Sequence, residues 1–308
     1  MHSPRRRLAE GGQAMAGKAR LLEPGVRLIL APNPSPMTHR GTNSYLIGDP
    51  SGPQVVIDPG PDDPGHMEAI LAAAPGGITH ILVTHAHVDH TALVPALKAA
   101  TGAEVLGFGP AGAGRSARMQ ALAAAGLAGG GEGVDAGHAP DRRLGDGDWI
   151  EGPGWRMQAL HTPGHFAGHL AFRLGDRLFS GDLAMGWAST LISPPDGDLA
   201  AFMASIERLR GLDLARLYPG HGDPVDAPAE RLDWLHAHRT ARSAALLAAL
   251  GPEPRGIPEL TRTLYADTPP ALIPAAERNV FAHLIDLVDR NQAAATPDLS
   301  PDAGFTRR

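Results

Sequence analysis

The segment Thr84-His85-Ala86-His87-Val88-Asp89-His90 stands directly after an apolar run, residues 80–84, that is typical of a buried strand. It places three imidazoles and one carboxylate within six residues. Imidazole and carboxylate groups suit zinc, and also iron or manganese. The segment therefore indicates part of a metal site, which needs further ligands from the rest of the chain.

Further ligands follow at three turns, each after an expected strand. They are His165 in His161-Thr162-Pro163-Gly164-His165, Asp182 in Phe179-Ser180-Gly181-Asp182, and His221 in Tyr218-Pro219-Gly220-His221-Gly222. Because loops at strand ends can converge on one edge of a sheet, these groups can meet the opening segment.

The composition restricts the classes of protein that fit. The chain has 308 residues, enough for one large domain and a small second one. Its hydrophobic fraction of 43% and charged fraction of 19% are typical of globular proteins, and no apolar run approaches the roughly 18 residues that cross a bilayer. Cysteine is absent, which excludes disulfides, thiolate zinc sites and cysteine nucleophiles and fits a cytoplasmic location. The net charge of −6 argues against a strong general surface for nucleic acid.

Strand and helix patterns alternate up to the Tyr218–Gly222 turn, and helices dominate after it. The expected strands are 26–31, 43–48, 54–58, 80–84, 155–160, 170–174 and 177–180. The expected helices are 63–74, 91–100, 199–209, 229–250, 257–265 and 275–290. Residues 109–137, rich in glycine and alanine, are interpreted as a mobile insertion with a helix near 116–125. This order favours two layered sheets between helices, followed by a small helical domain.

The order of the candidate ligands resembles that of the metallo-β-lactamase superfamily, and the resemblance implies a fold and two metal positions. The fold would be of the α/β class, a four-layer αββα sandwich. His85, His87 and His165 would hold the first metal, Asp89, His90 and His221 the second, and Asp182 would bridge the two. Asp89 would also act in catalysis by orienting the hydroxide. Asp58 and His169 would support the ligands from behind, because ligand imidazoles need partners that fix their tautomer.

Other stretches resemble one branch of that superfamily, the lactamase-β-2-like subgroup with a C-terminal winged-helix appendage. They are Asn33–Thr38, Gly41–Leu46, Tyr218–Gly222, His238-Arg239 and Leu260–Tyr265. We accordingly expect a disordered leader at 1–20, a catalytic domain at 21–226, a helical winged-helix-like domain at 227–296 and a tail at 297–308. The appendage would serve as a dimer contact, giving a homodimer, or as a lid over the active site.

The predicted function is that of a two-metal hydrolase with a metal-bridging hydroxide, loaded with two divalent ions, zinc before iron or manganese. Its substrate would be a phosphodiester, as in single-stranded RNA, or the carbonyl of an ester, thioester or lactone in a small molecule. Residues 227–308 hold 9 basic and 10 acidic side chains, a net charge of −1, which weakens the RNA interpretation because an RNA-binding domain is expected to be basic.

Two alternatives stay open at this point. One is a thioester hydrolase of the glyoxalase-II kind, although the C-terminal region has no basic cluster suited to an acidic thiol cofactor. The other is a nucleic-acid-binding or regulatory module that keeps the sandwich without catalysis, although none of the seven ligands is missing. A true β-lactamase fits less well, because no lysine follows His221 to anchor a substrate carboxylate.

Overall fold

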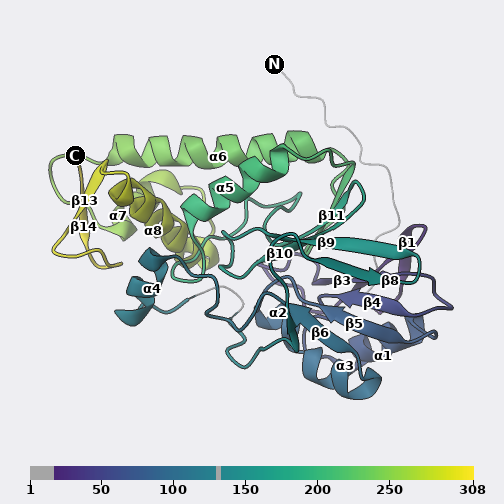
Figure 1. Cartoon of the computed structure of the whole chain (residues 1–308). Helices are drawn as coiled ribbons and strands as arrows, with labels where there is room; N and C mark the ends of the chain where they lie inside the picture. The colour runs from purple at the N-terminus through teal and green to yellow at the C-terminus, as the bar shows by residue number, and fades with distance from the viewer. Residues whose placement is uncertain (1–16, 130–132) are drawn as a thin grey trace.

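The computed structural model describes residues 17–129 and 133–308 of the chain (Figure 1). Most of the leader expected at 1–20 lies outside the described residues, and its last residue, Arg20, begins strand β1. Within the described ranges, no helix combines the length and apolar character that a membrane span requires.

The first sheet has seven strands in the order β1-β2-β3-β4-β5-β6-β7. They are β1 (Arg20–Glu23), β2 (Val26–Leu30), β3 (Asn43–Ile47), β4 (Gln54–Ile57), β5 (Ile78–Leu82), β6 (Glu104–Gly107) and β7 (Arg142–Arg143). Pairing is antiparallel from β1 to β4 and parallel from β4 to β7. Parallel neighbours need a crossover, and helices supply it. These are α1 (Pro64–Ala73) after β4, and α2 (Val88–Thr91) and α3 (Val94–Thr101) after β5.

The second sheet has five strands in the order β12-β11-β10-β9-β8. They are β8 (Trp149–Gly152), β9 (Trp155–His161), β10 (Leu170–Leu174), β11 (Arg177–Gly181) and β12 (Arg216–Pro219). Only β11 and β12 pair in parallel in this sheet, and α5 (Leu199–Arg210) is their crossover. Asp198 begins that helix by accepting hydrogen bonds from the N–H groups of Ala200 and Ala201.

Side chains along each strand point alternately to the two faces of the sheet, so each sheet packs on both sides. Leu28 and Val55 face the core between the sheets, where they meet Phe172 and Phe179 of the second sheet. The next residues on the same strands point the other way, toward α1 and α3. Helices α5 and α6 (Pro228–Ala249) cover the outer face of the second sheet (Figure 1). The four-layer αββα sandwich is thereby confirmed.

The helix expected at 91–100 has different first and last residues in the structure. It begins earlier, at Val88, and is interrupted between α2 and α3. Pro95 lies in the first turn of α3, the place where its missing N–H removes no helical hydrogen bond. The early start matters because α2 contains two of the candidate ligands, Asp89 and His90.

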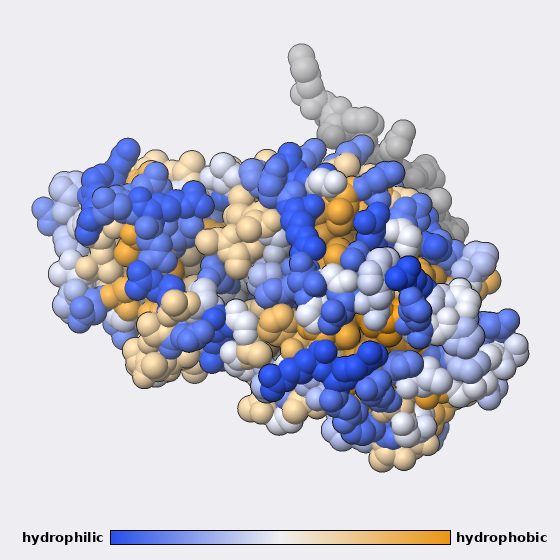
Figure 2. Space-filling view, in the orientation of Figure 1, coloured by the Kyte–Doolittle hydropathy of each residue, from blue (hydrophilic) through white to orange (hydrophobic). Residues whose placement is uncertain are grey.

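The C-terminal domain has its own core. It contains α7 (Ile257–Leu264), the 3₁₀ helix η1 (Pro270–Leu272), α8 (Ile273–Asp289) and a hairpin of β13 (Ala293–Thr296) and β14 (Gly304–Arg307). Apolar residues show on the face in view mainly in two zones, one over the sandwich and one over this domain (Figure 2). The insertion expected at 109–137 includes α4 (Ala117–Ala124), whose Met119 and Leu122 pack into the C-terminal core. That part of the insertion is therefore anchored.

The expected tail at 297–308 needs correction. Residues 304–307 form β14, and the Phe305 side chain is fully buried against Phe281. The sequence did not reveal this because Phe305 is the only large apolar residue in the segment apart from Leu299.

We predict that Phe305→Ala lowers the free energy of unfolding by about 3 to 5 kcal/mol, because it leaves a cavity in the C-terminal core. Urea titration followed by circular dichroism measures the change. Arg307→Ala, which alters an exposed side chain on the same strand, is the control. Equal stability of the two variants would contradict the placement of Phe305.

Candidate metal centre

The candidate ligands lie at one edge of the sandwich because of strand direction. Strands β4 and β5 run parallel, as do β11 and β12, so within each pair the carboxyl ends meet at the same edge. The turns that follow these ends carry Asp58, the 85–90 segment, Asp182 and His221. His165 joins them from the connection between β9 and β10. All seven predicted ligands are buried there.

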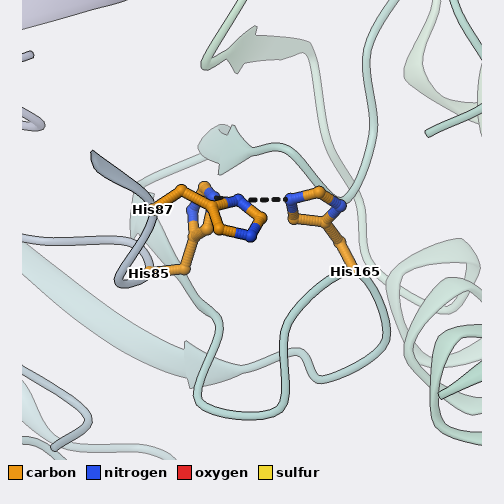
Figure 3. A group of neighbouring side chains, drawn as sticks. All are labelled: His85, His87 and His165. Atoms are coloured by element: carbon orange, nitrogen blue, oxygen red, sulfur yellow. Dashed lines mark hydrogen bonds between the residues drawn. The ribbon is translucent and has the colours of Figure 1, made fainter. Parts of the chain in front are cut away.

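The first group is His85, His87 and His165 (Figure 3). The Nε2 of His85 lies 2.9 Å from the Nδ1 of His87, and the Nε2 of His165 lies 3.1 Å from that same Nδ1. The three rings point toward one another from two separate segments of the chain (Figure 3). Three ring nitrogens converging in this way can serve together as ligands of one metal ion.

The second group is Asp89, His90 and His221. The Nε2 of His221 lies 3.2 Å from the Oδ2 of Asp89 and 3.3 Å from the Nε2 of His90. Asp182 lies between the groups, with its Oδ2 3.3 Å from the Nε2 of His221 and 3.8 Å from the Nε2 of His165. Its Oδ1 lies 3.6 Å from the Nε2 of His90. A carboxylate so placed can serve both groups.

Hydrogen bonds on the far side of the rings fix which nitrogen faces the centre. Asp58 accepts from the Nδ1 of His90 at 2.9 Å, and it also accepts from the amide and hydroxyl of Thr84 at 2.8 and 2.7 Å. The carbonyl of Leu191 accepts from the Nδ1 of His165 at 2.7 Å. The bonds to Asp58 and to the Leu191 carbonyl hold a proton on the Nδ1 of His90 and of His165 and leave each Nε2 free for a ligand.

His169 supports a candidate ligand through the main chain. Its Nε2 accepts from the amide of Asp182 at 3.2 Å, while its Nδ1 lies 2.9 Å from the hydroxyl of Thr162. It therefore holds the turn that carries Asp182 and does not contact a ligand imidazole through a hydrogen bond. The turn is tight as well: a Cβ at Gly220 would lie 2.3 Å from the Oδ1 of Asp182, so this position requires glycine.

Electrostatics distinguish the two groups of imidazoles. Burial lowers the pKa of His87 to about 3 and that of His85 well below its usual value. Burial also opposes a charge on His221, but the Asp182 and Asp89 carboxylates outweigh it and raise its pKa to about 9. The pKa of His90 is likewise raised well above its usual value, against burial, by Asp89, Asp58 and Asp182.

The residues fit a pair of divalent cations. The Oδ1 of Asp182 is buried and has no hydrogen-bond donor among the described residues. A buried carboxylate oxygen without a donor is costly unless a cation meets it. The remaining donors are imidazole nitrogens and one further carboxylate, a set that suits zinc, iron or manganese.

A cavity of about 250 Å³ opens on these groups. His87, Asp89, His165, Asp182 and His221 lie on its floor. One wall is formed by residues 185–191 and the other by the C-terminal domain, from Tyr265 to Asn279. The C-terminal domain thus contributes lining residues to the cavity over the candidate ligands.

Residues 37–221 match the family model of the metallo-beta-lactamase superfamily. The chain belongs to this superfamily. Residues 257–301 match the beta-lactamase associated winged helix domain. Members of the superfamily are typically metal-dependent hydrolases, and this chain is such an enzyme, with histidine and aspartate groups that can bind metal.

Relatives and solved structures cover most of the chain. The beta-lactamase-like protein 2 homolog of Caenorhabditis elegans is 30% identical over 84% of this chain and 82% of its own length. The homolog of that name in Drosophila melanogaster is 29% identical over 84% of this chain and 86% of its own. A metallo-beta-lactamase family protein from Thermus thermophilus superimposes with a TM-score of 0.74 and 27% identity, covering 94% of this chain and 100% of that one.

We predict that binding of Zn²⁺ to the metal-free protein releases protons. His90 and His221 hold protons near pH 7 because carboxylates raise their pKa values, whereas a metal needs the neutral imidazole. Affinity should therefore increase with pH up to about 9, the pKa of His221. Calorimetry at pH 7 in buffers of different ionisation enthalpy measures the release, and heats that are independent of the buffer would contradict it.

We also predict that Asp58→Ala weakens zinc binding about 10- to 100-fold, because the Nδ1 of His90 loses the acceptor that fixes its tautomer. Competition with a chromophoric chelator gives the dissociation constants. Asp62→Ala, which removes an exposed carboxylate from the same loop, should bind as the unaltered protein does.

Proposed function

We propose that the protein is a two-metal hydrolase of carbonyl esters, including thioesters and lactones, whose acyl group is uncharged and largely apolar. The observation that carries this choice is the lining of the cavity over the candidate ligands. No lysine or arginine lines it among the described residues. Phosphate and carboxylate groups are usually recognised by such side chains.

Apolar side chains from both domains form the walls. Met37, Met185, Trp187 and Leu191 come from the catalytic domain, and Leu272 comes from the C-terminal domain. A pocket with apolar walls and a few polar groups at one end fixes the orientation of an apolar ligand with its reactive end at the polar groups. An acyl chain or ring would then lie against the walls and place its carbonyl over the candidate ligands.

The same lining argues against RNA as the substrate. Bound cations would serve the phosphate that reacts, but the flanking phosphates of a strand would meet no cationic side chain among the described lining residues. Affinity for a nucleic acid comes largely from such contacts. The carboxylates of a glutathione thioester and of a β-lactam would lack partners for the same reason.

The roles of the chain's own residues follow from their positions. Bound divalent cations would supply acidity to a water and polarisation to the scissile carbonyl. Asp89, with a pKa lowered to about 2 by His90 and His221 against the effect of burial, stays ionised and orients the attacking water by accepting its hydrogen bond. The walls exclude other water, which strengthens these electrostatic interactions.

A substrate panel tests the proposal. The metal-loaded protein should hydrolyse an uncharged aryl ester, an alkyl thioester and a lactone faster than single-stranded RNA, a phosphodiester dye, a glutathione thioester or a β-lactam. His87→Ala and Asp182→Ala should reduce both the metal content and the ester hydrolysis to background. His236→Ala, on α6 and outside the cavity, is the matched control. Cleavage of RNA without cleavage of the uncharged esters would refute the proposal.

A further inference from the structure

Residues 189–192, which we call the strap, connect the wall of the cavity to two candidate ligands. The hydroxyl of Thr190 donates to the main-chain carbonyl of Asp182 at 2.5 Å. The carbonyl of Leu191 accepts from the Nδ1 of His165 at 2.7 Å. The strap therefore holds the turn that carries Asp182 and sets the tautomer and the orientation of the His165 ring.

The backbone of the strap is strained at Thr190. Thr190 has a φ of 60°, in the left-handed region that β-branched residues rarely adopt. Strained positions of this kind persist only when surrounding groups hold them. The strap therefore depends on contacts from the elements packed against it.

Two side chains supply these contacts, one from α6, which covers the second sheet, and one from α8 of the C-terminal domain. Arg239 of α6 donates from Nη2 to the carbonyls of Ser189 and Thr190, and from Nη1 to the Oδ1 of Asn279 at 3.1 Å. Asn279 of α8 uses the same oxygen to accept from the amide of Ile192 at 3.1 Å. Both ends of the strap are thus fixed, one by each residue.

Burial of the Arg239 guanidinium group costs free energy, which argues for a specific role of this residue. Its side chain is only 1% exposed, and it forms no ion pair with a carboxylate among the described residues. A buried cation without an anion is unfavourable unless hydrogen bonds compensate. Here the compensation comes from the strap carbonyls, from Asn279 and from the Phe202 ring, whose centroid lies 5.6 Å from the guanidinium carbon.

We propose that Arg239 and Asn279 are positioning residues for the metal centre, which act through the strap on His165 and Asp182. The proposal rests on the metal assignment in the proposed function. This role would give the C-terminal domain a second function besides lining the cavity. Through Asn279, docking of that domain sets the geometry of the ligands.

Metal affinity of the metal-free full-length chain tests this. Stepwise competition of Zn²⁺ against a chromophoric chelator gives two dissociation constants, and His165→Ala identifies the step that depends on that ring. Arg239→Met and Asn279→Leu should weaken this step about 10- to 100-fold, the range found when partners of ligand histidines are removed. Arg242→Met is the matched control, because Arg242 lies on the same helix but donates to the carbonyl of Leu264 and not to the strap.

A conservative variant separates positioning from folding. Asn279→Asp keeps the acceptor oxygen beside Arg239 and should bind zinc within about threefold of the unaltered protein, whereas Asn279→Leu should not. Circular dichroism and the midpoint of thermal unfolding show whether each variant folds. If Arg239→Met fails to fold, the Asn279 pair decides the result.

The outcomes are distinguishable. If Asn279→Leu is folded and binds both zinc ions as tightly as the unaltered protein, the positioning role is wrong. If His165→Ala itself binds zinc normally, the metal assignment fails, and the proposed function fails with it. Loss of the His165-dependent step in Asn279→Leu, with recovery in Asn279→Asp, supports the proposal.

Discussion

A buried carboxylate is stable only with positive charge close by, and imidazoles surround the buried carboxylate of Asp182. Burial raises the pKa of this carboxyl group, but His221 and His90 outweigh that effect and hold the pKa well below its usual value. Without metal, protons on these imidazoles supply the positive charge. Divalent cations would replace these protons as the positive charge beside Asp182. Gly220 leaves room for the carboxylate, and His169 holds its backbone in place.

The sandwich provides the edge on which this carboxylate meets its partners, but the sandwich alone does not make a binding site. Its strand ends gather polar groups, whereas the apolar wall that would receive a substrate comes in part from the C-terminal domain. The candidate ligands therefore come from the catalytic domain alone, whereas the cavity wall combines side chains of both domains. Relatives could keep the same ligands and change their substrates by altering the wall.

The sequence predicts the candidate site well because metal chemistry accepts few residue types, and the order of His85, Asp182 and His221 is informative. It predicts contacts through the main chain poorly, since the carbonyl of Leu191 has no side-chain signature. Strands β1, β7 and β8 were not predicted, because they are short and carry charged residues or glycine. Arg239 stood out only as part of a family resemblance, because burial without a carboxylate partner is a property of the tertiary structure.

Helix α4 has a consequence for how the molecule folds. It belongs to the connection between β6 and β7 of the first sheet, yet Met119 and Leu122 complete a core otherwise built from residues beyond 245. That core therefore closes a long loop through the middle of the chain, and this closure carries an entropic cost. The core of the C-terminal domain consequently includes side chains from the insertion in the catalytic domain. A fragment that lacked α4 would expose the apolar surface that this helix covers.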